Sequence, residues 1–300
     1  MAQERFVGFA GGLRLHVLAW PAGPGGAPSA APGGAPSAAP VLLLHGLASS
    51  ARIWEPVAAR LAAAGHPVFA ADLRGHGLSD KPDQGYDLAT FADDVAGLVE
   101  ALELDRPVVI GHSLGAFAIV EAFARRPDLG RLVRGVVLVE GALVDASVQF
   151  ATLDECLAGV ALPPVTGVPE ARLEGYFRHT YPDWADDRIA ATMASMEIRA
   201  DGIVAGWWLG PARVQMLARS MWEWHAAPLL PAVTAPALWI VADTGDAAWT
   251  AAKREAAAAT EAAMPRARIR WLVAEHDVHA QRPKEVAALI ADFIDDGLAG

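Results

Sequence analysis

The sequence predicts an α/β fold, in which a doubly wound, mostly parallel sheet carries helices on both faces and receives a helical insertion. Apolar runs such as residues 41–44 and 136–139 are typical of parallel strands buried on both faces. Helical periodicity follows at residues 88–102 and 114–124, and strands that alternate with helices form a parallel sheet. From about residue 142 to 231 helical patches replace the strands.

The other elements follow from the same two periodicities. In chain order, strands are expected at residues 6–9, 13–19, 41–44, 68–71, 108–110, 136–139, 237–242 and 268–273. The first two strands would form a hairpin that turns at Gly11-Gly12. Helices are expected at residues 53–64, 88–102, 114–124, 249–263 and 283–296.

A low-complexity tract separates the hairpin from the first buried strand. Its eight-residue unit, Gly-Gly-Ala-Pro-Ser-Ala-Ala-Pro, occupies residues 25–32 and recurs identically at residues 33–40. Small residues and prolines cannot bury side chains, so residues 21–40 are expected to form a disordered loop that connects two strands.

The expected division is a core of residues 1–141 and 232–300 and a helical cap of residues 142–231. Open α/β sheets bind ligands at the carboxyl ends of their strands, where this cap would lie. Most of the cap's aromatic side chains would pack the cap itself, and one or two would line an apolar pocket. The tryptophans concerned are Trp184, Trp207, Trp208, Trp222 and Trp224.

Composition narrows the possible partners. The formal net charge of −11 argues against a nucleic-acid partner and against anionic membrane surfaces. No apolar run approaches the ~20 residues that cross a bilayer, and residues 1–6 lack a signal-peptide core. The single cysteine, Cys156, precludes an intrachain disulfide and fits a reducing compartment. We therefore expect a cytoplasmic protein with a small-molecule partner.

The most informative stretch is Gly-His-Ser-Leu-Gly at residues 111–115, between an expected strand and an expected helix. This arrangement is typical of a nucleophile elbow. Ser113 would adopt a positive φ, and Gly111 and Gly115 would leave space where a Cβ would clash. Its hydroxyl would then project at a helix N-terminus, which favours developing negative charge.

A serine nucleophile needs a base. Of the nine histidines, His276 directly follows the last expected strand, which would place it in a loop near Ser113. His279 and His45 are the alternatives, while His112 is expected to shape the elbow. No histidine or cysteine cluster has zinc-ligand spacing, so neither a metal nor another cofactor is expected.

The third member of a triad would be a carboxylate. Asp246, in the loop after the strand expected at residues 237–242, ranks first. Glu140, which ends an earlier strand, ranks second, and Asp243 ranks third. Each also has a structural interpretation as a loop-capping or surface acid.

These motifs resemble the α/β-hydrolase superfamily, specifically its cap-bearing, lipase- and esterase-like branch. The resemblance runs from about residue 41 to the C-terminus, except the cap, and rests on residues 45–46, 72–79, 111–115 and 276–283. It implies Ser113 as nucleophile and His276, seven residues before a proline, as base. It also implies that the backbone N–H groups of Leu47 and Leu114 form the oxyanion hole. The loop at residues 72–79 would be structural.

The chain departs from this family's pattern at the acid. Relatives usually carry glycine, an acid, any residue and aspartate after the corresponding strand, whereas this chain has Asp-Thr-Gly-Asp at residues 243–246. Glu140 stands where some dehalogenases of this fold have their acid. Dehalogenases and epoxide hydrolases use an aspartate nucleophile, so Ser113 argues against both activities.

The expected function is that of a cofactor-independent serine hydrolase, which cleaves a small or medium apolar ester or lactone through an acyl-enzyme. The same fold and triad also support carbon–carbon bond hydrolysis of a vinylogous diketone, or peptidase activity. A ligand-binding protein that retains the triad is the non-enzymatic alternative. Turnover of p-nitrophenyl esters, diketones and amino-acid anilides would separate these functions.

Overall fold

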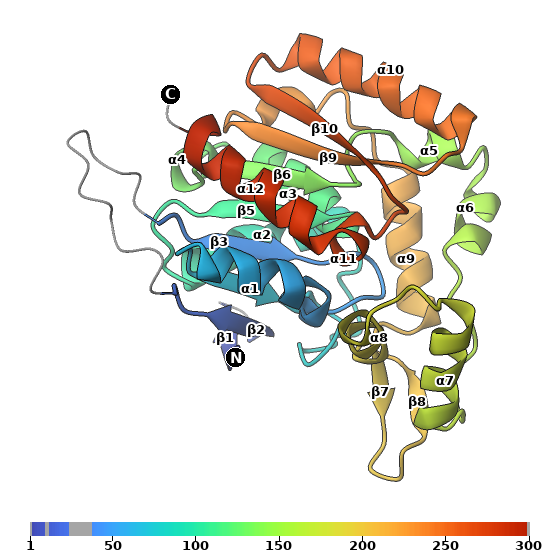
Figure 1. Cartoon of the computed structure of the whole chain (residues 1–300). Coiled ribbons are helices and arrows are strands. Elements are labelled where there is room, and N and C mark those ends of the chain that lie inside the picture. Colours follow the sequence, from blue (N-terminus) through green and yellow to red (C-terminus); the bar gives the residue numbers. More distant parts are fainter. Residues whose placement is uncertain (1, 10–11, 24–37, 299–300) are drawn as a thin grey trace.

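The computed structural model describes residues 2–9, 12–23 and 38–298 and contains an eight-stranded sheet in the order β1-β2-β4-β3-β5-β6-β9-β10 (Figure 1). β1 and β2 form the expected antiparallel hairpin, β2 also pairs antiparallel with β4, and the remaining neighbours are parallel. The predicted fold class is therefore confirmed. The strands are β1 (Gln3–Gly8), β2 (Arg14–Trp20), β3 (Val41–Leu44), β4 (Val68–Ala71), β5 (Val108–His112), β6 (Gly135–Val139), β9 (Ala237–Asp243) and β10 (Ala267–Val273).

Strand side chains alternate between two apolar cores, one on each face of the sheet. In β3, Leu42 and Leu44 pack with the residues of α2 and α3, whereas Val41 and Leu43 pack with those of α1 and α12. All four side chains are fully buried, because parallel strands covered on both faces leave no side for water. The helices of the core are α1 (Glu55–Ala63), α2 (Leu88–Ala101), α3 (Leu114–Arg125), α4 (Leu129–Leu132), α10 (Ala247–Ala263), α11 (Val278–Gln281) and α12 (Pro283–Gly297).

A polar side chain caps the N-terminus of α2. The Asp87 side chain accepts a hydrogen bond of 2.9 Å from the Thr90 amide, and α2 begins at Leu88, directly after Asp87.

Two 3-10 turns connect other elements. The turn η2 (Ala51–Trp54) leads into α1, and η3 (Leu230–Ala232) leads back to the sheet. The tract expected to be a loop at residues 21–40 falls mainly on residues 24–37, outside the described residues.

The insertion, defined here as the elements between β6 and β9, is helical as expected but also contains a short antiparallel strand pair, β7–β8. One of these strands has only three residues, too few for a period-2 pattern to emerge. Part of the insertion has its own apolar cluster, which includes Leu173, Ile189 and Met196. The elements are α5 (Ala146–Gln149), α6 (Leu153–Gly159), α7 (Glu170–Thr180), α8 (Asp186–Met193), β7 (Met196–Ile198), β8 (Val204–Trp207) and α9 (Pro211–Trp222).

Candidate active site

The turn between β5 and α3 has the geometry of a nucleophile elbow. Ser113 adopts φ +47° and ψ −114° and is the N-cap residue of α3, but its hydroxyl makes no cap hydrogen bond. A Cβ on Gly115 would lie 2.7 Å from the Leu44 carbonyl oxygen, and one on Gly111 would overlap the backbone of Gly115. The two glycines therefore permit the close packing that holds Ser113 in a strained conformation.

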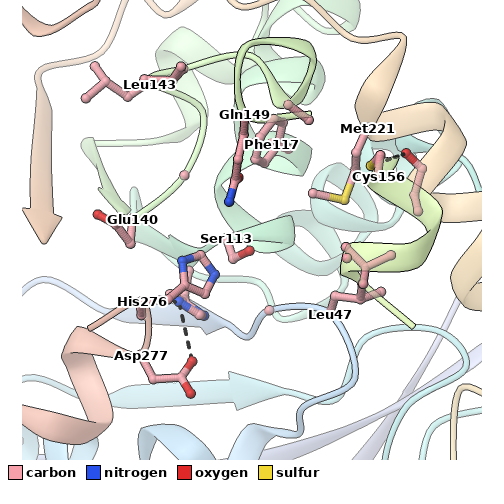
Figure 2. A pocket seen from close by; sticks show the side chains of 18 of the residues that line it. Leu47, Ser113, Phe117, Glu140, Leu143, Gln149, Cys156, Met221, His276 and Asp277 are labelled. Carbon is pink, nitrogen blue, oxygen red and sulfur yellow. Dashed lines mark hydrogen bonds and ion pairs between the residues drawn. The ribbon is translucent and has the colours of Figure 1, made fainter. Parts of the chain in front are cut away.

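Ser113 faces a cavity of about 520 Å³ between the sheet and the insertion. The turns at the carboxyl ends of β3, β5, β6, β9 and β10 line one side, and α5, α6 and α9 line the other (Figures 1 and 2). The wall is mainly apolar and includes Leu47, Phe117, Leu143, Val144, Phe150, Cys156, Val160, Leu162, Met221, Trp239, Val241 and Trp249.

The expectation that tryptophans of the insertion would line this cavity is wrong for the described residues. Its two tryptophans, Trp239 and Trp249, belong to β9 and α10 of the core. Two tryptophans of the insertion pack against other aromatic side chains instead. Trp224 meets Phe117 edge to face at 4.8 Å, and Trp184 stacks on a neighbouring tyrosine.

His276 lies in the loop after β10 and lines the same cavity as Ser113. Its carbonyl oxygen accepts a hydrogen bond of 3.1 Å from Nε2 of His112, and the two imidazole rings are 4.9 Å apart. The histidine of the elbow thus anchors the loop that carries the candidate base. Burial lowers the pKa of His112 to about 3, so this side chain stays neutral at physiological pH.

The two competing histidines have other surroundings. His279 is fully buried, with its ring 4.3 Å from that of Trp54 and 4.2 Å from that of His112, and it does not line the cavity. Nε2 of His45 accepts a hydrogen bond of 3.0 Å from the Leu73 amide. Burial lowers the pKa of both imidazoles. The structure therefore brings only His276, among the three candidates, to the cavity.

The carboxylate that ranked first from sequence is engaged in capping a helix. Asp246 accepts hydrogen bonds of 3.0 Å from the amides of Ala248 and Trp249 at the start of α10, is exposed, and does not line the cavity. Asp243 accepts hydrogen bonds from the Gly245 amide and the Thr250 hydroxyl, and it also lies outside the cavity wall.

Glu140 is the candidate carboxylate that lines the cavity with Ser113 and His276. Figure 2 shows these three labelled side chains at the wall of the cavity. Glu140 follows β6 with φ +46°, and its side chain is 6% exposed. Its Oε2 accepts a hydrogen bond of 2.6 Å from the Ala242 amide, and its Oε1 forms an ion pair with Nζ of Lys253.

The two backbone amides expected to form an oxyanion hole belong to the turns that follow β3 and β5. Leu114 is the first residue of α3, so its N–H has no acceptor within the helix. Leu47 lines the cavity in the turn after β3. Because Nε2 of His45 accepts a bond from an amide, its Nδ1 carries the proton and donates to the Gly46 carbonyl at 2.7 Å, which helps to fix this turn.

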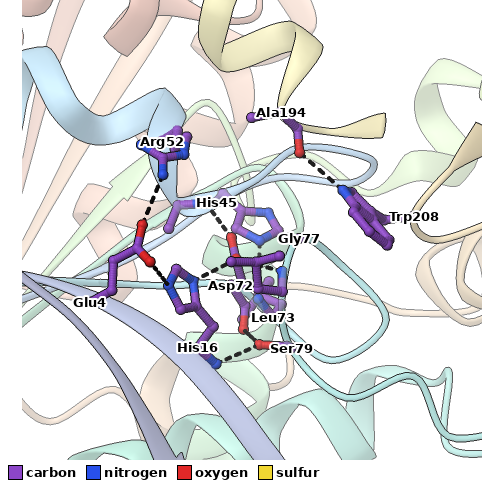
Figure 3. Close-up of polar contacts among 12 residues, drawn as sticks. Glu4, His16, His45, Arg52, Asp72, Leu73, Gly77, Ser79, Ala194 and Trp208 are labelled. Atoms are coloured by element: carbon purple, nitrogen blue, oxygen red, sulfur yellow. Dashed lines mark hydrogen bonds and ion pairs between the residues drawn. The ribbon is translucent and has the colours of Figure 1, made fainter. Parts of the chain in front are cut away.

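The loop at residues 72–79 is held by a buried carboxylate (Figure 3). Asp72 accepts hydrogen bonds from Nδ1 of His16 at 2.9 Å and from the amides of Ala51 and Leu78 at 2.7 and 2.9 Å. Burial opposes ionisation of Asp72, but these hydrogen bonds outweigh it and lower its pKa to about 2. This network connects β2, the loop at residues 72–79 and the start of η2.

Sequence reasoning missed Lys253, which lines the cavity beside Glu140. A lysine in an alanine-rich helix ordinarily points to solvent, and no local motif distinguishes this one. In the described part of the chain, no group of three or more histidine, cysteine or acidic side chains could hold a metal ion. No helix among the described residues is long and apolar enough to cross a membrane.

Comparison with known proteins finds a matching family and similar relatives. Residues 41–289 match the model of the alpha/beta hydrolase family. A 2-(acetamidomethylene)succinate hydrolase from Mesorhizobium japonicum is 35% identical over 54% of this chain, and the match spans 56% of that relative, little more than half its length. An N-formylmaleamate deformylase from Pseudomonas putida is 32% identical over 68% of this chain and 70% of its own.

Similarity to solved structures extends over nearly the whole chain. The crystal structure of E-2-(acetamidomethylene)succinate hydrolase superposes with a TM-score of 0.78 at 27% identity, covering 98% of this chain and 100% of that chain. The similarity therefore includes the insertion as well as the sheet.

Proposed function

The chain belongs to the alpha/beta hydrolase family of enzymes, and on that premise we propose that it is a serine hydrolase acting on small acyl compounds. The observation that carries this proposal is the shared cavity, whose wall includes Ser113, His276 and Glu140. A serine at positive φ at the N-terminus of a helix, facing an enclosed space with a histidine, favours acyl transfer to the hydroxyl.

The proposed reaction has two halves. His276 accepts the proton of the Ser113 hydroxyl as the oxygen attacks the acyl carbonyl, and the amides of Leu47 and Leu114 donate to the oxyanion. The protonated imidazole then gives its proton to the leaving group, which departs and leaves an acyl-enzyme. In the second half His276 deprotonates a water molecule, which attacks the acyl-enzyme. The carboxylic acid product leaves, and the imidazolium returns the proton to the Ser113 hydroxyl.

We assign the acid of the triad to Glu140. Asp246 ranked first from sequence, but its exposed carboxylate caps α10, whereas Glu140 is buried in the wall that His276 shares. A buried carboxylate beside the base orients the imidazole and stabilises its protonated form. Glu140 follows β6, so the acid would come from the strand next to that of the nucleophile.

The cavity favours a neutral, apolar acyl group. Lys253 is the one lysine or arginine among the described residues of its wall, and Glu140 already pairs with it. The relatives named for 2-(acetamidomethylene)succinate and N-formylmaleamate act on compounds that carry carboxylates. The apolar side chains of Leu47, Phe117 and Met221 instead suit a substrate whose acyl part has no charge.

Hydrolysis of an acylated nitrogen is the second candidate, because the structural similarity to the acetamidomethylene-succinate enzyme extends over 98% of the chain. A panel of p-nitrophenyl esters, lactones, N-acyl enamides and vinylogous diketones, each with and without a carboxylate, would separate these activities. We expect neutral esters or lactones to be turned over fastest, and Ser113→Ala to abolish that turnover. A carboxylate-bearing enamide as the best substrate would contradict the substrate assignment, and full activity of Ser113→Ala would contradict the mechanism.

A further inference from the structure

A buried lysine holds the carboxylate that we assign to the triad. Nζ of Lys253 meets Oε1 of Glu140 and donates a second hydrogen bond of 2.9 Å to the carbonyl of Ala242. The side chains are 4% and 6% exposed. Nζ also lies 5.4 Å from the ring centroid of Trp249, one turn earlier in α10.

Stability alone is a poor explanation for this ion pair. Two buried opposite charges lose hydration that their attraction often only offsets, so apolar residues of similar size stabilise a core about as well. The pair instead lies in the wall of the cavity that contains Ser113 and His276. Its position therefore points to the chemistry of the site.

We propose that Lys253 is a positioning residue, which holds the Glu140 carboxylate by its ion pair and directs it toward His276; this inference rests on the proposed serine hydrolase function. The Ala242 amide anchors Oε2 and Lys253 anchors Oε1. Each carboxylate oxygen can accept two hydrogen bonds, so both anchors leave capacity for the imidazole N–H.

Among the charged groups near the pair, Lys253 is the cation that faces Glu140. The titratable groups of the cavity wall are Glu140, Lys253, His112, His276, Asp277 and Cys156. Asp277 is near a different cation, Arg188, at 3.7 Å, and Asp243 at the end of β9 is 3.9 Å from Arg254. Removing Lys253 would leave Glu140 buried without its counter-ion and Oε1 without its anchor, so the carboxylate would orient the imidazole less well.

The test is the rate at which a fluorophosphonate acylates the serine between pH 6 and 9 in the full chain. We expect Lys253→Met to slow labelling on the order of 10- to 100-fold, the range typical for groups that orient a catalytic residue. Lys253→Arg, which keeps the charge that pairs with Glu140, should recover most of the rate. Lys284→Met, which removes an exposed lysine of α12, is the matched control and should label like the unaltered chain.

A double variant separates a positioning role from a structural one. If Lys253 acts through Glu140, Glu140→Gln with Lys253→Met will label no more slowly than Glu140→Gln alone. Independent losses in the double variant, or an unaltered labelling rate in Lys253→Met, would overturn the inference. Lys253→Gln gives the same readout if the methionine variant does not fold. Failure of the unaltered chain to label at Ser113 would instead refute the proposed function.

Discussion

The buried, neutral histidines predict that the protein loses stability in mild acid. Burial is the main cause that lowers the pKa of His76 and of His112, each to about 3. In the unfolded chain both side chains return to about 6.5. Between these values the unfolded state binds more protons than the folded state, so the free energy of unfolding falls as pH drops below 6.5.

The expected loss follows from this linkage. Lowering the pH from 7.5 to 5.5 stabilises the unfolded state by about 1.4 kcal/mol for each such histidine, or roughly 3 kcal/mol for the pair. Asp72 affects the free energy of unfolding in a more acidic pH range, because its pKa in the folded protein is lowered to about 2. Its contribution is present above the usual aspartate pKa and is lost only as pH falls below about 4.

Urea unfolding followed by circular dichroism at several pH values measures this effect. His76→Asn should be less stable at neutral pH, since it loses the bond that Nε2 of His76 accepts from the Ala48 amide at 3.1 Å. Between pH 7.5 and 5.5 the free energy of unfolding of this variant should nevertheless fall by about 1.4 kcal/mol less than that of the unaltered chain. His179→Gln, at an exposed position on α7, is the control and should retain the full pH dependence. An unchanged pH dependence in His76→Asn would refute the reasoning.

Three further predictions concern the site. Glu140→Gln should lower kcat by about 10²- to 10⁴-fold on the best ester, whereas Asp246→Asn, which can still cap α10, should stay within about twofold; the reverse order would restore Asp246 as the acid. Gly111→Ala should remove fluorophosphonate labelling, because its Cβ would overlap backbone at the elbow, and labelling at the normal rate would show that the turn tolerates a side chain. Met221→Trp should shift preference toward shorter acyl chains by filling the cavity, as measured by relative kcat/KM across an ester series.

The sequence predicted the sheet well because its signals are local. β4 begins and ends where the apolar run predicts, at Val68 and Ala71, and β3 and β6 agree within one residue. The elbow was equally accessible, since strand, glycines and helix adjoin in the chain. β7 and β8 were missed because their pairing depends on the fold of the insertion and not on a local pattern.

The acid illustrates what local signals cannot resolve. Asp246 lies in the loop after β9, where the sequence analysis placed it. An aspartate immediately before an alanine-rich helix is also an N-cap signal, and the structure shows Asp246 in that role. Glu140 reaches the cavity because β6 ends beside β5 in the sheet. Burial of Lys253 depends on how α10 packs against the rest of the core, which no residue near it in the chain reveals.

Covalent labelling tests the central claim most directly. The full chain would be treated with a fluorophosphonate and digested, and the modified peptide would be identified by mass spectrometry, with Ser113→Ala and urea-unfolded protein as controls. We predict one adduct, on Ser113 of the folded protein, and none in either control. A folded protein without an adduct on Ser113, or one labelled equally in Ser113→Ala, would contradict the assignment of this serine as the nucleophile.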